Sequence, residues 1–227
     1  MAFNKVSPTP VPIPNNQFQE TQEMNNNNNY NKVEIPQIQK KPRVLCLHGF
    51  RTSAEILKKQ VGRWPQTLLG KLDLAFVDGP CLARGKSDVE AFFDPPYYEW
   101  FHSNQGALLS AALPGMQLEG VALTKVPMIK FLIIISGAKF GGHKFGLPKL
   151  AANAFSSPIK LPSLHIIGET DFLKEHGIAL LESFQDPIVI YHAKGHTVPR
   201  LDEKGVGTVL GFIEKIWQMQ LQEEIEQ

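Results

Sequence analysis

Short apolar runs, each ended by glycine, proline, serine, aspartate or histidine, recur along the chain after residue 42. Five of them span residues 43–47, 74–77, 131–135, 164–167 and 188–191. Nearly continuous apolar runs of this length are typical of parallel strands that are covered on both faces. Between these runs, apolar residues recur at helical spacing over residues 54–69, 107–116, 172–184 and 203–221. Strands that alternate with helices predict an α/β protein with a doubly wound, mostly parallel sheet.

The beginning of the chain has a different composition. It contains Pro8, Pro10, Pro12 and Pro14, then a run of asparagines over 25–29, with few bulky apolar residues. Such a segment buries too little apolar surface to offset the entropy of ordering it. We therefore expect residues 1–40 to be a disordered Asn/Pro-rich tail and residues 41–227 to form one domain. The tail has no arginine and no apolar core, so it predicts neither a transit peptide nor a secretory signal.

Charge and cysteine content argue against several classes of protein. The formal net charge of +1 offers no basic field for nucleic acid. No apolar stretch approaches the ~20 residues that cross a bilayer, so we expect no membrane association. Cys46 and Cys81 are too few for a disulfide framework, which suits a reducing compartment. The expected location is the cytoplasm, with the nucleus as a second location, and the sequence indicates no particular protein partner.

Polar residues that could carry out chemistry follow several of the predicted strands. Ligands of open α/β sheets bind beyond the carboxyl ends of the strands, so His48, Asp171 and His196 are expected at one rim. There His196 could act as a general base, and Asp171 could hold its imidazole in the useful tautomer. The order Asp then His is that of α/β-hydrolases, whose nucleophile comes earlier in the chain.

Each of these residues also has a purely structural interpretation. Asp171 could cap the helix that follows it, His196 could be a surface histidine, and His48 with Gly49 could form a tight turn. His192 and His196 stand four residues apart, the spacing of a helical metal pair, but a glycine and an apolar run beside them argue against a helix. We therefore expect no metal and no cofactor.

Six segments of the chain resemble the FSH family of serine hydrolases, small members of the α/β-hydrolase fold, and the likeness is greatest to its plant members. The segments are residues 44–50 (VLCLHGF), 76–80 (FVDGP), 97–100 (YYEW), 106–112 (GALLSAA), 168–171 (GETD) and 195–199 (GHTVP). The resemblance implies hydrolysis of carboxylic esters or thioesters of small acyl substrates by a Ser-His-Asp mechanism. It assigns the catalytic roles to Asp171 and His196, and the oxyanion loop to Gly49 and Phe50.

The chain departs from the family pattern between Trp100 and Ala107. The family has a helix, the central strand and a Gly-x-Ser-x-Gly nucleophile turn at this point, and that motif occurs nowhere in this chain. Aligned on Gln105, the nucleophile position holds Asn104, and Ser103 lies one residue too early. We expect Ser103 to be the attacking residue, Gln105 to be the second oxyanion donor, and the sheet to lack the strand before the nucleophile.

The missing helix, strand and loops would amount to about 25 to 35 residues. Without the central strand its two neighbours lose a partner, so we expect them to close up or to be poorly ordered. The alternative function is therefore a catalytically inactive, truncated hydrolase-like protein, from a splice or gene-model variant, that binds a ligand or a partner. From the sequence, whether this chain is an enzyme stays open.

Overall fold

The structure is a computed structural model that describes residues 40–101, 106–141 and 145–226. The predicted tail, residues 1–40, lies outside the described residues except for Lys40. Contacts divide the chain into Met1–Ile38 and Gln39–Gln227, and the described helices and strands all belong to the second unit.

Five strands of this unit form two parallel sheets. In the first, β1 (Arg43–Leu47) pairs with β2 (Asp73–Val77). The second has the order β5 (Leu132–Ile135), β6 (Ser163–Gly168), β7 (Ile188–His192). Each of the five predicted strands is found within two residues of its expected bounds.

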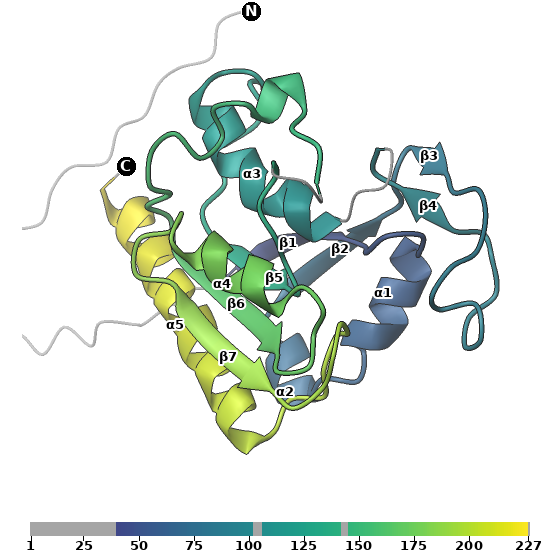
Figure 1. Ribbon diagram of the computed structural model, residues 1–227. Helices are drawn as coiled ribbons and strands as arrows, with labels where there is room; N and C mark the ends of the chain where they lie inside the picture. Colours follow the sequence, from purple (N-terminus) through teal and green to yellow (C-terminus); the bar gives the residue numbers. More distant parts are fainter. Residues whose placement is uncertain (1–39, 102–105, 142–144, 227) are drawn as a thin grey trace, which may run out of the picture. The chain divides into compact units, whose positions relative to one another are not determined.

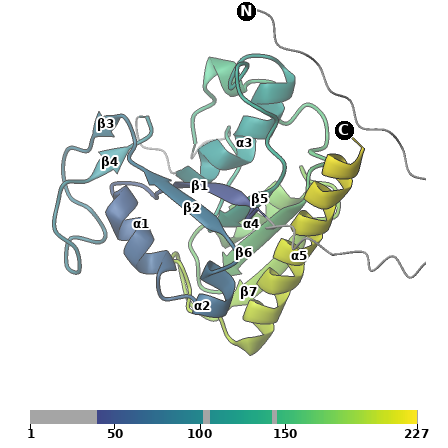
Figure 2. The ribbon, with the colours of Figure 1, turned by 180° about the vertical axis from the view of Figure 1, so that it is seen from behind.

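Helices cover both faces of these strands, as Figures 1 and 2 show from opposite sides. On one side lie α3 (Gly106–Leu118) and α4 (Lys174–Leu181). On the other lie α1 (Ala54–Val61), α2 (Gln66–Leu69) and α5 (Glu203–Ile225). The prediction of a doubly wound α/β fold is confirmed.

The prediction of one helix over residues 54–69 is wrong, because two helices occupy this stretch. Helix α1 begins after Ser53, whose hydroxyl accepts the N–H of Ile56, and ends before Gly62. Pro65 precedes α2 and has no N–H to continue the first helix. Helix α4 starts two residues later than expected, because the Asp171 side chain accepts the N–H of Leu173 in the turn before it.

Three further elements are absent from the sequence-based prediction. The strands β3 (Cys81–Leu82) and β4 (Tyr98–Glu99) form an antiparallel ribbon, and η1 (Lys149–Ala151) is a single 3-10 turn. Elements of two or three residues are too short to show a hydrophobic period, so no pattern in the sequence could indicate them.

The main core lies between the second sheet and α5. Every residue of β6 is buried, and Leu164 and Ile166 are fully enclosed against Val209 and Phe212 of α5. A second cluster joins α3 to the segment around η1 and includes Leu108, Ala112 and Ala154. The strands nearest the core are therefore the ones with continuous apolar runs, as expected for strands covered on both faces.

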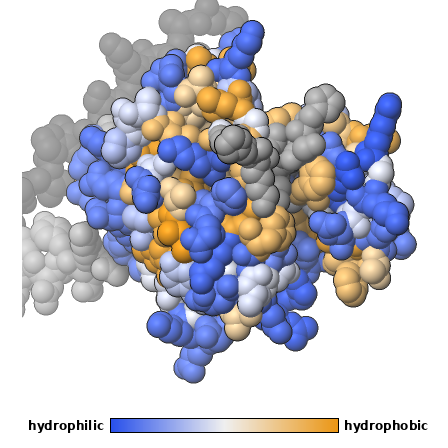
Figure 3. Space-filling model, viewed as in Figure 1, coloured by the Kyte–Doolittle hydropathy of each residue, from blue (hydrophilic) through white to orange (hydrophobic). Residues whose placement is uncertain are grey.

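Within the described residues, the sheet is divided between β1 and β5. Strand β1 pairs only with β2 and β5 pairs only with β6. This is the position of the central strand that the family resemblance predicts to be missing. The exposure of Leu45 is consistent with the absence of this central strand. Leu45 in β1 is 59% exposed, whereas every residue of β6 is buried. Further apolar side chains reach the surface on the face that carries α3 and α4 (Figure 3).

Candidate active site

The loop after β1 is fixed by His48, whose side chain is completely buried. Its Nδ1 lies 2.7 Å from the carbonyl oxygen of Gly49, and its Nε2 accepts the N–H of Gly79 at 2.9 Å. Because Nε2 is the acceptor, Nδ1 carries the proton and the ring is neutral. Burial, only partly opposed by the bond to Gly49, lowers the pKa of His48, in keeping with this assignment. His48 therefore shapes the loop and is not itself a base.

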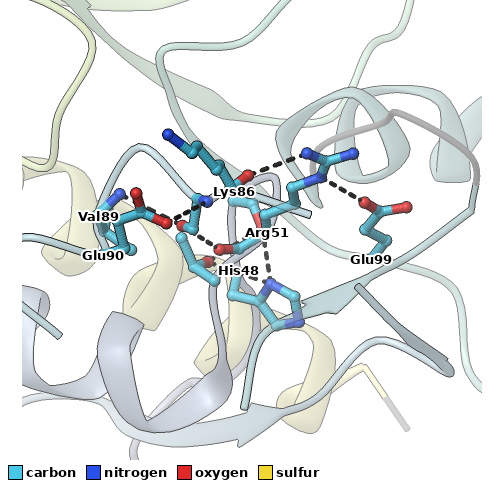
Figure 4. Close-up of polar contacts among 9 residues, drawn as sticks. His48, Arg51, Lys86, Val89, Glu90 and Glu99 are labelled. Carbon is cyan, nitrogen blue, oxygen red and sulfur yellow. Dashed lines mark hydrogen bonds and ion pairs between the residues drawn. The ribbon is translucent and has the colours of Figure 1, made fainter. Parts of the chain in front are cut away.

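Polar contacts between Arg51 and residues later in the chain hold the same loop (Figure 4). Arg51, in a left-handed conformation with φ of 48°, donates to Glu99 of β4 at 2.9 Å and to the carbonyl of Lys86 at 2.9 Å. The Ser87 hydroxyl donates to the Arg51 carbonyl at 2.6 Å. Sequence reasoning missed these residues, because partners 35 to 48 positions apart leave no local pattern.

Asp171 lies in the turn between β6 and α4, and its side chain is only 1% exposed. Its Oδ1 accepts the N–H of Leu173 at 2.8 Å. Burial alone would raise the pKa of this carboxyl group. The backbone N–H of Leu173 and the ring of His196 outweigh that effect. The nearby Ser136 hydroxyl also lowers the pKa of Asp171. The pKa of Asp171 is consequently held below its ordinary value, and the group is a carboxylate at neutral pH.

His196 follows β7 and faces Asp171 directly. Its Nδ1 lies 3.0 Å from both carboxylate oxygens of Asp171. This contact assigns the proton to Nδ1 and makes Nε2 the basic nitrogen of the ring. The ring of Phe172 lies beside the imidazole, with 4.7 Å between ring centroids. The structure thus brings together the two residues that the sequence pairs as base and orienting acid. Phe172 was missed, because an aromatic residue after an aspartate is an ordinary start to a helix.

A cavity of about 640 Å³ opens beside this pair and runs between β1 and β5. Gly49, Phe50, Ser136, Phe172 and His196 are among the residues that line it. The loop predicted to supply the oxyanion hole therefore shares one cavity with the predicted base, whereas His48 is turned away from it. Its walls are mainly apolar, so the arrangement can place an ester or thioester next to a histidine oriented by a carboxylate.

The predicted nucleophile Ser103 and the predicted oxyanion donor Gln105 lie outside the described residues. The residues that flank them are described, and both approach the end of β1. The indole of Trp100 donates to the carbonyl of His48 at 2.9 Å, and the N–H of Gly106 donates to the same oxygen at 3.0 Å. The chain before and after residues 102–105 is therefore hydrogen-bonded to His48, at the rim where the cavity opens.

The two cysteines of the chain can also be placed. Burial raises the pKa of the Cys46 thiol to about 12, so this cysteine is not a nucleophile. Cys81 is exposed on β3. The described part of the chain contains no group of three or more side chains suited to hold a metal ion. None of its helices is long and apolar enough to cross a membrane.

A family model described as "Serine hydrolase (FSH1)" matches the chain over residues 38–105 and 103–206. The chain belongs to the FSH family of serine hydrolases. The match comes in two stretches that meet at residues 103–105, where the resemblance places the missing helix, strand and nucleophile turn. The α/β-hydrolase fold expected of this family agrees with the parallel strands and the two helical layers of this chain.

Several relatives of this chain are named esterases. The chain is 28% identical to mouse esterase OVCA2 over 203 residues, which are 69% of this chain and 89% of the relative. It is 25% identical to esterase AGAP003155 of Anopheles gambiae, over 71% of this chain and 73% of the relative. Among solved structures, esterase PE8 gives a TM-score of 0.46 at 18% identity, covering 78% of this chain and 93% of that one. Arabidopsis thaliana SOBER1 gives 0.44 at 16% identity, covering 78% and 99%.

Proposed function

We propose that the chain hydrolyses carboxylic esters or thioesters of small acyl substrates, with His196 as general base and Asp171 as its orienting partner. The supporting observation is the contact between His196 Nδ1 and both oxygens of Asp171, at 3.0 Å, beside a mainly apolar cavity. A buried carboxylate on Nδ1 fixes the tautomer that leaves Nε2 basic, and it stabilises the imidazolium that forms when the ring takes a proton. Membership of a family of serine hydrolases supports the same class of reaction.

In the proposed reaction the hydroxyl of Ser103 attacks the carbonyl carbon, and His196 Nε2 takes the hydroxyl proton. The carbonyl oxygen becomes an oxyanion, for which the backbone N–H groups of Gly49, Phe50 and Gln105 are the proposed donors. His196 then returns its proton to the departing alcohol or thiol. Water, deprotonated by the same nitrogen, hydrolyses the acyl-enzyme and regenerates the serine.

The second candidate function is an inactive hydrolase-like protein that binds a ligand or a partner. Two observations favour it: the chain contains no Gly-x-Ser-x-Gly motif, and, within the described residues, the sheet that would carry the nucleophile turn is divided between β1 and β5. A nucleophile displaced by about 1 Å can cost a hundredfold in rate. The two candidates therefore differ in whether a serine reacts, and not in whether the cavity binds a ligand.

Labelling of the full chain with a fluorophosphonate probe, mapped by peptide mass, separates the candidates. We expect the label on Ser103, and we expect Ser103→Ala and His196→Ala to abolish it. The matched control is Ser157→Ala, an exposed serine far along the chain, which should label as the parent does. Well-folded protein that takes no label on any serine would overturn the hydrolase proposal and support the inactive form.

A further inference from the structure

Within the described residues, the cavity between β1 and β5 lies where one further strand would stand in the sheet. It is lined by four consecutive residues of β1, 44–47, and by the last three residues of β5, 133–135, with Ser136 directly after them. Successive side chains of a strand point to opposite faces of its sheet, so a cavity on one face meets every second residue. A cavity that meets consecutive residues of both strands must lie at their edges, in the plane of the sheet.

The two edges that face this cavity carry backbone groups suited to pairing. Within the described residues β1 pairs on one side only, with β2, and β5 pairs on one side only, with β6. In a parallel ladder the N–H and C=O groups of a strand point alternately to its two sides. Half of these groups on β1 and β5 therefore point toward the cavity, where hydrogen-bonding partners are needed.

The helices on the two faces of the cavity contribute mostly apolar side chains, with Gln60 of α1 and Ser110 of α3 as polar exceptions. Leu57 and Val61 of α1 lie on one side, and Ala107 of α3 lies on the other. The acidic and basic residues among the described lining residues are Asp88 and His196, and both belong to segments beyond the ends of the strands. An occupant that pairs with both strand edges must therefore be uncharged, mainly apolar on both faces, and able to hydrogen-bond along both edges.

The chain between the described residues Phe101 and Gly106 is too short to supply such a strand. It has four residues, about 13 Å when fully extended. Trp100 and Gly106 are both bonded to the His48 carbonyl at the carboxyl end of β1. A segment that ran along the five residues of β1 and returned would need more than twice that length.

We infer that the cavity between β1 and β5, called the slot below, is a binding site for an extended, uncharged peptide strand rich in valine and isoleucine, running parallel to β1 and β5. The strand would add to both edges at once, which is β-augmentation with two ladders in place of the usual one. A hydrocarbon ligand could fill the volume but could not pair with the edges. This inference does not depend on hydrolase activity.

The test uses the full chain and a fluorescent peptide in which four alternating valines and isoleucines stand between terminal lysines. Binding is followed by fluorescence anisotropy and by amide hydrogen exchange. We expect saturable binding and slower exchange in β1 and β5. A peptide N-methylated at alternate residues keeps its apolar surface but loses ladder donors, and we expect it to bind at least about tenfold more weakly.

Two variants locate the site. Leu45, 59% exposed and part of the slot lining, is changed to lysine, and Leu82, 66% exposed on β3, is changed to lysine as the matched control. We expect Leu45→Lys to weaken binding at least about tenfold and Leu82→Lys to leave it unchanged. The inference is overturned if no peptide binds, if the N-methylated peptide binds equally well, or if protection appears only at the outer edges of β2 and β7.

Discussion

The imidazole of His196 and the carboxylate of Asp171 meet across the ends of two adjacent strands, with Nδ1 3.0 Å from each carboxylate oxygen. The backbone positions both residues: β6 and β7 are parallel neighbours, so the turns after them open on the same rim. The Leu173 N–H holds the carboxylate in place from the opposite side. This pair is the part of the site on which a catalytic role can be tested directly.

Replacement of Asp171 by asparagine should abolish most activity and leave the fold intact. Asparagine keeps an oxygen for the Leu173 N–H but cannot hold the Nδ1–H tautomer of His196 as a carboxylate does. The equivalent change in a well-studied triad lowers kcat about 10⁴-fold, and we expect a loss of at least a hundredfold in ester hydrolysis. Asp73→Asn, at an exposed ion pair with Arg43, is the matched control. Unchanged rates in Asp171→Asn would contradict the assigned role.

Stability should fall as the pH is lowered from about 6.5 toward 4, because of His165. This histidine of β6 is 2% exposed, and burial lowers its pKa from 6.5 to about 4. Above pH 6.5 the ring is neutral in both folded and unfolded chains. Below that pH only the unfolded chain takes up the proton, so unfolding becomes easier until the folded pKa is reached. The difference corresponds to about 3 kcal/mol.

Urea unfolding at several pH values checks this prediction, with His165→Leu as the comparison. The variant has no proton to bind at this position, so its free energy of unfolding should vary less between pH 6.5 and 4. His176 lies in the first turn of α4, and His176→Leu is the control that should retain the parent's pH dependence. Parallel curves for the parent and His165→Leu would show that another group governs the acid sensitivity.

Most of the strands and the Asp171–His196 pair could be predicted from the sequence, because each rests on a local pattern. A parallel strand buried on both faces is a continuous apolar run, and residues directly after such runs share a rim. The contacts that fix the oxyanion loop could not be predicted, since Arg51 and Glu99 stand 48 positions apart. Pro65 indicated a break in the helix predicted over residues 54–69. The helical spacing of the apolar residues around it nevertheless favoured one continuous helix. The absence of the strand before the nucleophile turn followed from the family pattern and not from hydrophobicity. Its two neighbours have not closed up, because β1 and β5 do not pair within the described residues.

The ion pair between Arg51 and Glu99, at 2.9 Å, should contribute more to stability than the shorter pair between Arg43 and Asp73, at 2.7 Å. The side chains of the first pair are 28% and 12% exposed, and those of the second are 80% and 47% exposed. Exposed pairs contribute about 0 to 1 kcal/mol, whereas leaving Glu99 unpaired in a mostly buried position should cost about 1 to 3 kcal/mol. Chemical unfolding of Arg51→Ala and Arg43→Ala measures the difference. Equal losses in the two variants would refute it.

Two glycines in helices should respond to alanine in opposite directions. A Cβ on Gly115 of α3 would overlap the backbone carbonyl of Ala154, in the cluster that joins α3 to the segment around η1. Backbone cannot move aside as a flexible side chain can, so we expect Gly115→Ala to lower the free energy of unfolding by at least about 2 kcal/mol. Gly211 of α5 has nothing within 4 Å of the added carbon, and there alanine should stabilise by about 0.5 to 1 kcal/mol through its higher helix propensity. Thermal and urea unfolding of the two variants provide the measurement. A neutral Gly115→Ala would mean that α3 and the chain at Ala154 are not packed as closely as the structure has them.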